Sequence, residues 1–222
     1  MTGTRIDPNT DSATTWETII DWTRLNARLL GIAGAVVLAA ALVFWFVTRS
    51  RELQAAGAER ALLLARRSMQ AGNLPLAQSD LQKVYSKYGS TVPGVQAALL
   101  IAQLDFDQGK FQDGINVLRE VSGKGAAEPM TSAIRSLIGD GTMMLKKPAE
   151  AAKEYEAAAA ATNMENARNY ERAKAARAYT AAGDTASARR IWTELRDDPK
   201  SAAMATEARV RLGELEARVA QK

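Results

Sequence analysis

The sequence predicts an all-α protein, in which an N-terminal single transmembrane helix precedes an α-solenoid of four helix pairs and a C-terminal capping helix. Two features of the 222 residues support this prediction. A spacing of 37 residues recurs at Ala77, Gly114, Ala151 and Ala188. A fixed period of this size is typical of stacked helical hairpins. Before the repeats, residues 29–47 form an uninterrupted apolar run that is long enough to cross a lipid bilayer.

The composition favours helices and excludes several kinds of active site. Hydrophobic residues make up 47% of the chain and aromatic residues only 6%, which favours close-packed helices over a β-sandwich. The chain has no cysteine and no histidine, so disulfides, thiolate nucleophiles, Cys/His zinc sites and imidazole acid–base catalysis are excluded. Acidic and basic residues are mixed along the chain, which indicates a solvated surface and not a nucleic-acid-binding stripe.

The first 28 residues contain a polar tail and a short amphipathic segment. Residues 1–13 are mostly polar and are expected to form a flexible tail. Residues 14–28 begin with a Thr-x-x-Glu capping box and carry apolar residues at helical spacing, which predicts an amphipathic helix at a membrane surface. Its predicted interfacial anchors are Trp16 and Trp22, because an indole combines an apolar body with a polar N–H. The alternative is that this segment simply continues the next helix.

Residues 29–48 are predicted to form a membrane anchor. At about 1.5 Å rise per residue, the apolar run is roughly 28 Å long, close to the hydrocarbon thickness of a bilayer. Arg28 and Arg49 flank the run, and Trp45 is an interfacial anchor among the aromatic residues near its second end. A cleaved signal peptide is the competing interpretation. The long, partly acidic leader and the length of the run disfavour it.

Small residues recur four apart within the anchor, at Gly31, Ala35 and Ala39. Such a stripe lets another transmembrane helix approach closely, so these residues are predicted to form a packing face. The alternative is that alanine is simply common in membrane spans. The charges do not decide the orientation of the anchor, because basic residues are similar in number on its two sides and long domains translocate largely regardless of charge.

Residues 52–222 are predicted to form the repeat domain, whose helices are separated by short breaks containing glycine or proline. A glycine five residues before each repeated small residue is expected to supply the left-handed turn that ends the first helix of the unit. The exception is Lys146, which replaces this glycine in the third unit. A lone terminal helix would cover the last apolar face of the solenoid. The predicted units are about 53–89, 93–124, 129–163 and 166–198, with a cap at 201–221.

Two further positions of the repeat indicate how its helices pack. Small residues stand where the two helices of a unit are expected to cross, at Ala65 and Ala77 in the first unit, because a larger side chain would push the helix axes apart. Four residues after each repeated small residue stands a larger one, which is expected to fill the space between one unit and the next. These larger residues are Leu81, Leu118, Tyr155 and Trp192.

This pattern resembles the tetratricopeptide repeat, with the nearest match at Tyr179, Gly183, Ala188, Trp192 and Pro199. The whole layout of tail, tryptophan-containing stretch, single span and four repeats resembles the YfgM family. That resemblance implies a single-pass protein of the bacterial inner membrane, with a cytoplasmic N-terminus and a periplasmic repeat domain. It also implies an ancillary subunit of the SecYEG translocon that works with periplasmic chaperones or clients.

Tetratricopeptide solenoids usually bind partners on a concave face built from the first helix of each unit, so the resemblance also indicates a candidate groove. Its apolar residues suit loosely specified apolar segments, and its arginines could pair with acidic groups of a partner. The alternative is that the apolar residues belong to the core between repeats. The predicted groove residues are Leu62, Arg66, Met69, Leu99, Gln103, Phe106, Asp140, Met143, Tyr170 and Arg177.

The acidic, lysine and tyrosine residues form no recognisable catalytic constellation, so neither an enzymatic activity nor a cofactor is expected. The predicted function is a membrane-anchored protein-interaction scaffold or adaptor. Its expected partners are other membrane proteins, such as translocon components, together with the lipid bilayer, and no nucleic acid. The alternative function is a structural accessory subunit of a larger photosynthetic or respiratory membrane complex, which docks through the transmembrane helix and the repeat domain.

Overall fold

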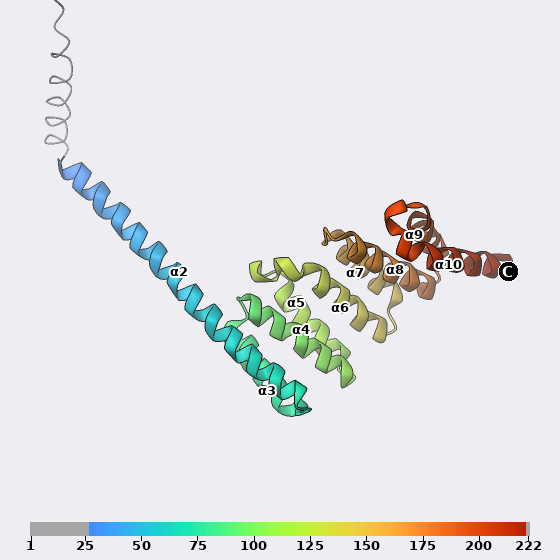
Figure 1. Ribbon diagram of the computed structural model, residues 1–222, viewed down its shortest axis with the longest axis horizontal. Helices are drawn as coiled ribbons and strands as arrows, with labels where there is room; N and C mark the ends of the chain where they lie inside the picture. Colours follow the sequence, from blue (N-terminus) through green and yellow to red (C-terminus); the bar gives the residue numbers. More distant parts are fainter. Residues whose placement is uncertain (1–26, 221–222) are drawn as a thin grey trace, which may run out of the picture. The chain divides into compact units, whose positions relative to one another are not determined.

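The structure, a computed structural model, describes the backbone of residues 27–220, and within that range the side chains of all but residues 27, 29, 30, 33, 34, 51 and 218–220. The predicted tail and both tryptophans of the interfacial segment, Trp16 and Trp22, lie outside the described residues. Every regular element in residues 27–220 is a helix, and this part of the chain contains no strand (Figure 1).

Nine α-helices and two short 3-10 helices make up the described part of the chain. The 3-10 helices are η1 (Gly125–Met130) and η2 (Pro199–Ser201). The α-helices are α2 (Ala27–Gln70), α3 (Leu74–Tyr88), α4 (Val92–Asp107), α5 (Phe111–Ser122), α6 (Thr131–Met144), α7 (Pro148–Ala160), α8 (Glu165–Ala182), α9 (Thr185–Asp197) and α10 (Ala202–Ala220).

The chain divides into two compact units, residues 1–53 and residues 54–222. In the first unit, the described residues belong to α2, and the aromatic side chains of Phe44, Trp45 and Phe46 are between 63% and 72% exposed. The predicted packing residues Gly31, Ala35 and Ala39 lie on the same part of α2 and are also exposed. None of the helices, over the residues described, is long and apolar enough to cross a membrane, and the predicted transmembrane helix is not confirmed.

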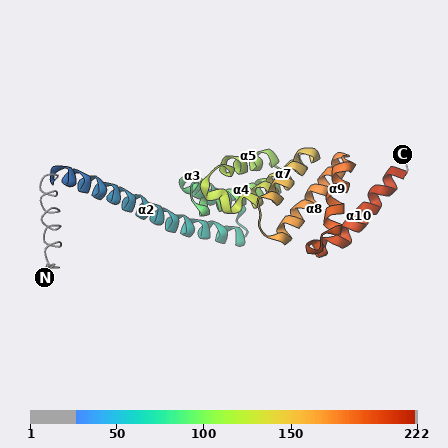
Figure 2. The same cartoon turned by 90° about the horizontal axis from the view of Figure 1, so that it is seen from above.

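The second unit is a solenoid of stacked helical hairpins. From α3 to α10, each helix packs against the next along the chain, and Figures 1 and 2 show these hairpins following one another in sequence order. Neighbouring first helices also touch, since α4 contacts α6 and α8 contacts α10. The C-terminal part of α2 joins this unit by burying Leu62 and Ala65 in the same apolar cluster as α3 and α4. The predicted all-α solenoid is confirmed.

The four turns between the first and second helices of the units share one geometry. Gly72, Gly109 and Gly183 have φ values of 74°, 77° and 80°, and Lys146 takes the same left-handed conformation with a φ of 58°. The N–H of Lys146 donates to the carbonyl of Met143 at 2.9 Å, and the next N–H donates five residues back, to Thr142, at 3.1 Å. The other three turns repeat both bonds, which is the Schellman arrangement. The predicted left-handed turns are confirmed, and the lysine forms one too.

The small residues of the repeat lie where helices approach closely. A Cβ atom on Gly114 of α5 would stand 2.9 Å from the carbonyl oxygen of Ala102 on α4. A Cβ atom on Gly139 of α6 would stand 2.5 Å from the ring of Tyr155 on α7. Both distances are shorter than a carbon atom can tolerate, so a larger residue would force the helices apart. The larger residues of the repeat, Leu81, Leu118, Tyr155 and Trp192, are at most 3% exposed.

Lys146→Gly is expected to raise the free energy of unfolding by about 0.5–1 kcal/mol. The left-handed conformation costs a residue with a Cβ atom about 1–2 kcal/mol, and glycine avoids this cost but loses more backbone entropy on folding. Urea unfolding of the full chain, followed by circular dichroism, would measure the change. The reciprocal control, Gly109→Lys, should lower stability by a similar amount. A loss of stability in Lys146→Gly would contradict the argument.

Gly114→Ala is expected to lower the free energy of unfolding by about 1–3 kcal/mol, because the added methyl group meets a backbone carbonyl that cannot turn aside. The matched control is Gly213→Ala in α10, where a Cβ atom meets nothing within 4 Å. That change should stabilise the chain by about 0.5–1 kcal/mol through helix propensity alone. If the same urea titration gave both variants the same sign, close crossing at Gly114 would not be the cause.

Candidate interaction groove

The predicted groove residues differ in how far they reach the surface. Met69, Leu99 and Phe106 are partly buried against the apolar cluster of α2 to α6, and Met143 is partly buried against that of α7 to α10. Leu62 is buried in the first of these clusters. The exposed members are Arg66, Gln103 and Tyr170, while Asp140 and Arg177 are half-buried.

Phe106 contacts two other helices besides its own. Its ring lies 2.6 Å from where a Cβ atom would stand on Gly114 of α5, and 2.6 Å from where one would stand on Gly141 of α6. The centre of the ring is 6.3 Å from that of Phe111. The glycines therefore make room for Phe106 between two units, and only part of its surface remains open to a partner.

The two predicted arginines of the groove contact the next first helix in the same way. Arg66 donates from Nη2 to the side-chain oxygen of Gln96 on α4 at 3.3 Å. Arg177 donates from Nε and Nη2 to both carboxylate oxygens of Glu207 on α10, at 2.9 and 2.7 Å. Gln96 and Glu207 each stand 30 residues after their arginine. Both arginines thus have partners within the chain, although the Arg177 side chain remains 40% exposed.

A polar cluster joins α6, α7 and α8 beside the groove, and it includes two predicted groove residues. Lys174 Nζ lies 2.8 Å from Asp140 Oδ1 and 2.7 Å from the hydroxyl oxygen of Ser136. The same ammonium group stands 4.5 Å from the centre of the Tyr155 ring and 5.9 Å from that of Tyr170. The hydroxyl of Tyr155 donates to Asp140 at 2.7 Å. Asp140 and Tyr170 are therefore brought together through a lysine.

Sequence reasoning missed Lys174 as part of this cluster, whereas the period of 37 residues places Ser136 in one groove row with Leu62 and Leu99. Lys174 stands three residues before the predicted groove residue Arg177, on the same side of α8, so its position beside the groove was a detectable signal.

The lysine of the polar cluster and the neighbouring Glu171 are largely closed to solvent, whereas Tyr170 is exposed. The side chain of Lys174 is 15% exposed, and that of Glu171 is 11% exposed. Burial raises the pKa of the Glu171 carboxyl, although the charge of Lys174 opposes that shift. Burial also raises the pKa of Tyr155, and its hydrogen bond to Asp140 adds to the effect. The hydroxyl of Tyr155 therefore stays protonated and acts as a donor.

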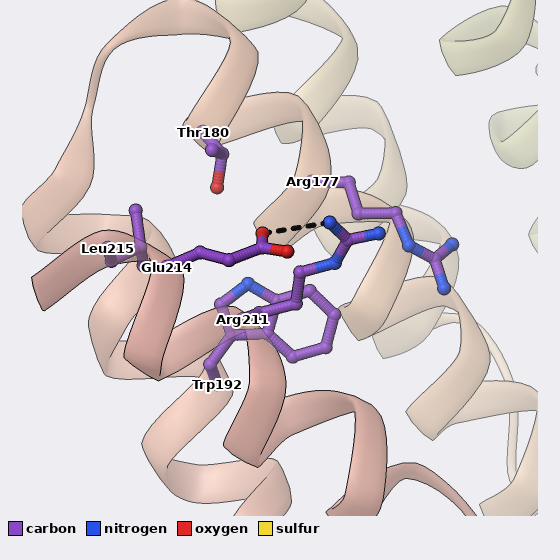
Figure 3. A pocket seen from close by; sticks show the side chains of 6 residues that line it. All are labelled: Arg177, Thr180, Trp192, Arg211, Glu214 and Leu215. Atoms are coloured by element: carbon purple, nitrogen blue, oxygen red, sulfur yellow. Dashed lines mark hydrogen bonds and ion pairs between the residues drawn. The ribbon is translucent and has the colours of Figure 1, made fainter. Parts of the chain in front are cut away.

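A cavity of about 190 Å³ opens between α8, α9 and α10 (Figure 3). Arg211 donates from Nη1 to Glu214 at 3.0 Å on its rim. The indole nitrogen of Trp192 is buried and has no hydrogen-bond partner among the described residues. No group of three acidic side chains in the described part of the chain could hold a metal ion. The residues that line the cavity are Arg177, Thr180, Trp192, Arg211, Glu214 and Leu215.

Known proteins resemble this chain in their fold. A family model described as a tetratricopeptide repeat-like domain matches residues 47–176. No curated protein matches the chain. The TPR-like repeats of a putative kinesin light chain from Podosopora anserina are 19% identical, with 73% of this chain and 92% of that chain covered and a TM-score of 0.54. BtubC (BKLC) from P. vanneervenii is 14% identical, with 76% and 84% covered and a TM-score of 0.58. At these identities the likenesses show the fold alone.

Glu207→Gln is expected to lower the free energy of unfolding by about 1 kcal/mol at pH 7, since a paired carboxylate is lost. The hydrogen bonds from Arg177 lower the pKa of Glu207 below its ordinary value of 4.5. The stabilisation is therefore complete above pH 4.5 and is lost as the pH falls through the lowered pKa.

Urea unfolding of both proteins at pH 7 and at successive values below 4.5 would measure this difference. Glu59→Gln, at an exposed position of α2, is the control and should change stability little at any pH. A difference between wild type and Glu207→Gln that stayed constant down to acid pH would rule out the ion pair as its source.

Proposed function

The chain belongs to the tetratricopeptide repeat-like domain family, and on this premise we propose that it is a protein-interaction scaffold whose repeat domain binds partner proteins. Proteins built from stacked repeats present extended concave surfaces and generally act as binding scaffolds without catalysis. The observation that carries the proposal is the row of first helices, where α4 meets α6 and α8 meets α10. Exposed polar residues such as Gln103 and Tyr170 stand on these helices beside half-buried apolar ones.

The proposal includes a membrane anchor at residues 29–48. Residues 29–47 contain no charged side chain, and Phe44, Trp45 and Phe46 are largely exposed on α2. A continuous exposed apolar surface marks a contact with lipid or with another protein. With the resemblance to the YfgM family, this supports a bacterial inner-membrane protein with a periplasmic repeat domain. In that setting the chain acts as an ancillary translocon subunit or a chaperone-associated subunit.

A second candidate function is a structural accessory subunit of a larger photosynthetic or respiratory membrane complex. The stripe of Gly31, Ala35 and Ala39 favours it, because these small residues are exposed on α2. A Cβ atom on Gly31 would meet nothing within 4 Å, so the surface there is open to another helix.

Photo-crosslinking in native membranes tests the proposal. A photoreactive residue at Gln103 or at Tyr170, both exposed on first helices, is expected to capture translocon components or secreted proteins. The control position is Lys153, which is exposed on the second helix α7 and should capture neither. The membranes are first washed with alkaline carbonate, which an anchored chain is expected to resist.

The results separate the parts of the proposal. Release of the chain by carbonate would contradict the proposed membrane anchor. Equal capture from Lys153 would contradict the proposal that partners bind in the groove. Purification in a gentle detergent distinguishes the second function. A fixed stoichiometry with one large photosynthetic or respiratory complex would support the accessory subunit and overturn the translocon role.

A further inference from the structure

The third and fourth units place equivalent residues in the same arrangement but with different chemistry. In the third unit, the hydroxyl of Tyr155 donates to Asp140 at 2.7 Å, and Lys174 stands 4.5 Å from the centre of the ring. One period of 37 residues later, the equivalent positions are Trp192, Arg177 and Arg211. All three of these residues line the cavity between α8, α9 and α10.

In the fourth unit the hydrogen-bond acceptor of the third unit is absent, while Trp192 still provides a donor. The carboxylate of Asp140 accepts the hydrogen bond in the third unit, whereas the guanidinium of Arg177 has donors and no acceptor. Trp192 is fully buried, and its indole N–H has no partner among the described residues. Figure 3 shows the indole nitrogen on the side of the ring that faces Glu214 and Thr180. A buried donor without an acceptor is unfavourable, so the fourth unit lacks a group that the third unit supplies from within.

The side chains around the cavity can admit such a group. Arg177 and Arg211 are 40% and 43% exposed, and Glu214 is 48% exposed. The indole nitrogen itself is covered. An exposed side chain at the rim must therefore move before an incoming acceptor can reach the nitrogen. The ion pair of Arg211 with Glu214 is of the surface type, which contributes little to stability and separates readily.

We propose that this cavity binds the carboxylate of an acidic side chain from a partner protein. One carboxylate oxygen accepts from Trp192 Nε1, and the other accepts from Arg177 or Arg211, so the partner restores what Asp140 provides in the third unit. Arg177 pairs with Glu207 and Arg211 pairs with Glu214, so the partner's carboxylate exchanges with one of these carboxylates at a partly exposed guanidinium, and such a charged donor favours an anionic acceptor over a neutral one. The inference rests on the proposed scaffold function and specifies the chemistry of one contact with its partner.

Titration of the full chain in detergent micelles, with the indole nitrogens labelled with ¹⁵N, tests this inference. The probes are two capped tripeptides, Ala-Glu-Ala and its control Ala-Gln-Ala. Loss of one signal in Trp192→Phe identifies the Trp192 indole resonance. The glutamate peptide is expected to shift this resonance in a saturable way, and the glutamine peptide to leave it in place at the same concentrations. Equal shifts with both peptides, or no shift with either, would overturn the proposal.

Variants locate the contact. Arg211→Gln should weaken binding of the glutamate peptide about tenfold, because one charged donor is lost. Arg177→Asp places the residue type of the third unit in the fourth, so the indole gains an internal acceptor and peptide binding should be lost. Arg66→Gln, at the equivalent position of the first unit, is the matched control and should bind as wild type does. Circular dichroism checks that each variant keeps its helices.

Two further results separate this inference from its alternatives. If Glu214→Gln alone moved the Trp192 resonance in the absence of peptide, and the peptide then had no effect, the acceptor would come from Glu214 and the proposal would fail. Crosslinks from Gln103 and Tyr170 that persisted in Arg177→Asp would leave the scaffold function intact. Failure of the cavity proposal and failure of the scaffold are therefore distinguishable.

Discussion

The backbones of α4 and α5 come into contact because Gly114 faces the carbonyl of Ala102 with no side chain between them. The other units repeat this approach with alanine or glycine at the same two positions, and a left-handed turn brings the second helix back onto the first. The larger residue four positions further on can then reach both helices around it, as Tyr155 does with Gly139 of its own unit and Lys174 of the next. The order of the first helices along the solenoid, and with it the candidate groove, depends on this steric constraint.

The apolar interior is not uniform along the solenoid. One cluster extends from α2 to α6 and a second from α7 to α10, and the polar cluster around Lys174 lies where they meet. A buried lysine that satisfies Asp140 and Ser136 at once accepts few other arrangements of α6 and α8, so it fixes their register more narrowly than apolar packing does. Asp140, expected from the sequence to face a partner, is bound here by Lys174 and Tyr155 of the chain itself, whereas Tyr170 stays exposed.

The turns and the small residues at the helix crossings recur with the period and could be predicted from the sequence. Each unit needs the same close approach of its two helices. The turn at Lys146 is an example: its place in the period outweighed its unfavourable residue type. The contacts that join one unit to the next could not be predicted in this way. Lys174 reaches Asp140 and Ser136 at separations of 34 and 38 residues, neither of which is the period. The sequence predicts that Phe106 is available to a partner, but its ring fills the space over Gly114 and Gly141.

Helix α10 contacts only the elements that precede it in the described solenoid. Within the described residues, α10 packs against α8, α9 and η2. Since each unit of a solenoid is stabilised mainly by its immediate neighbours, α10 can detach while the preceding hairpins stay folded. Such local opening would hydrate Trp192 and Leu212 together, as both are buried in the cluster of α7 to α10. Within the described solenoid, the amide hydrogens of α10 should therefore exchange faster than those of α8, and a ligand seated against α10 would slow that exchange.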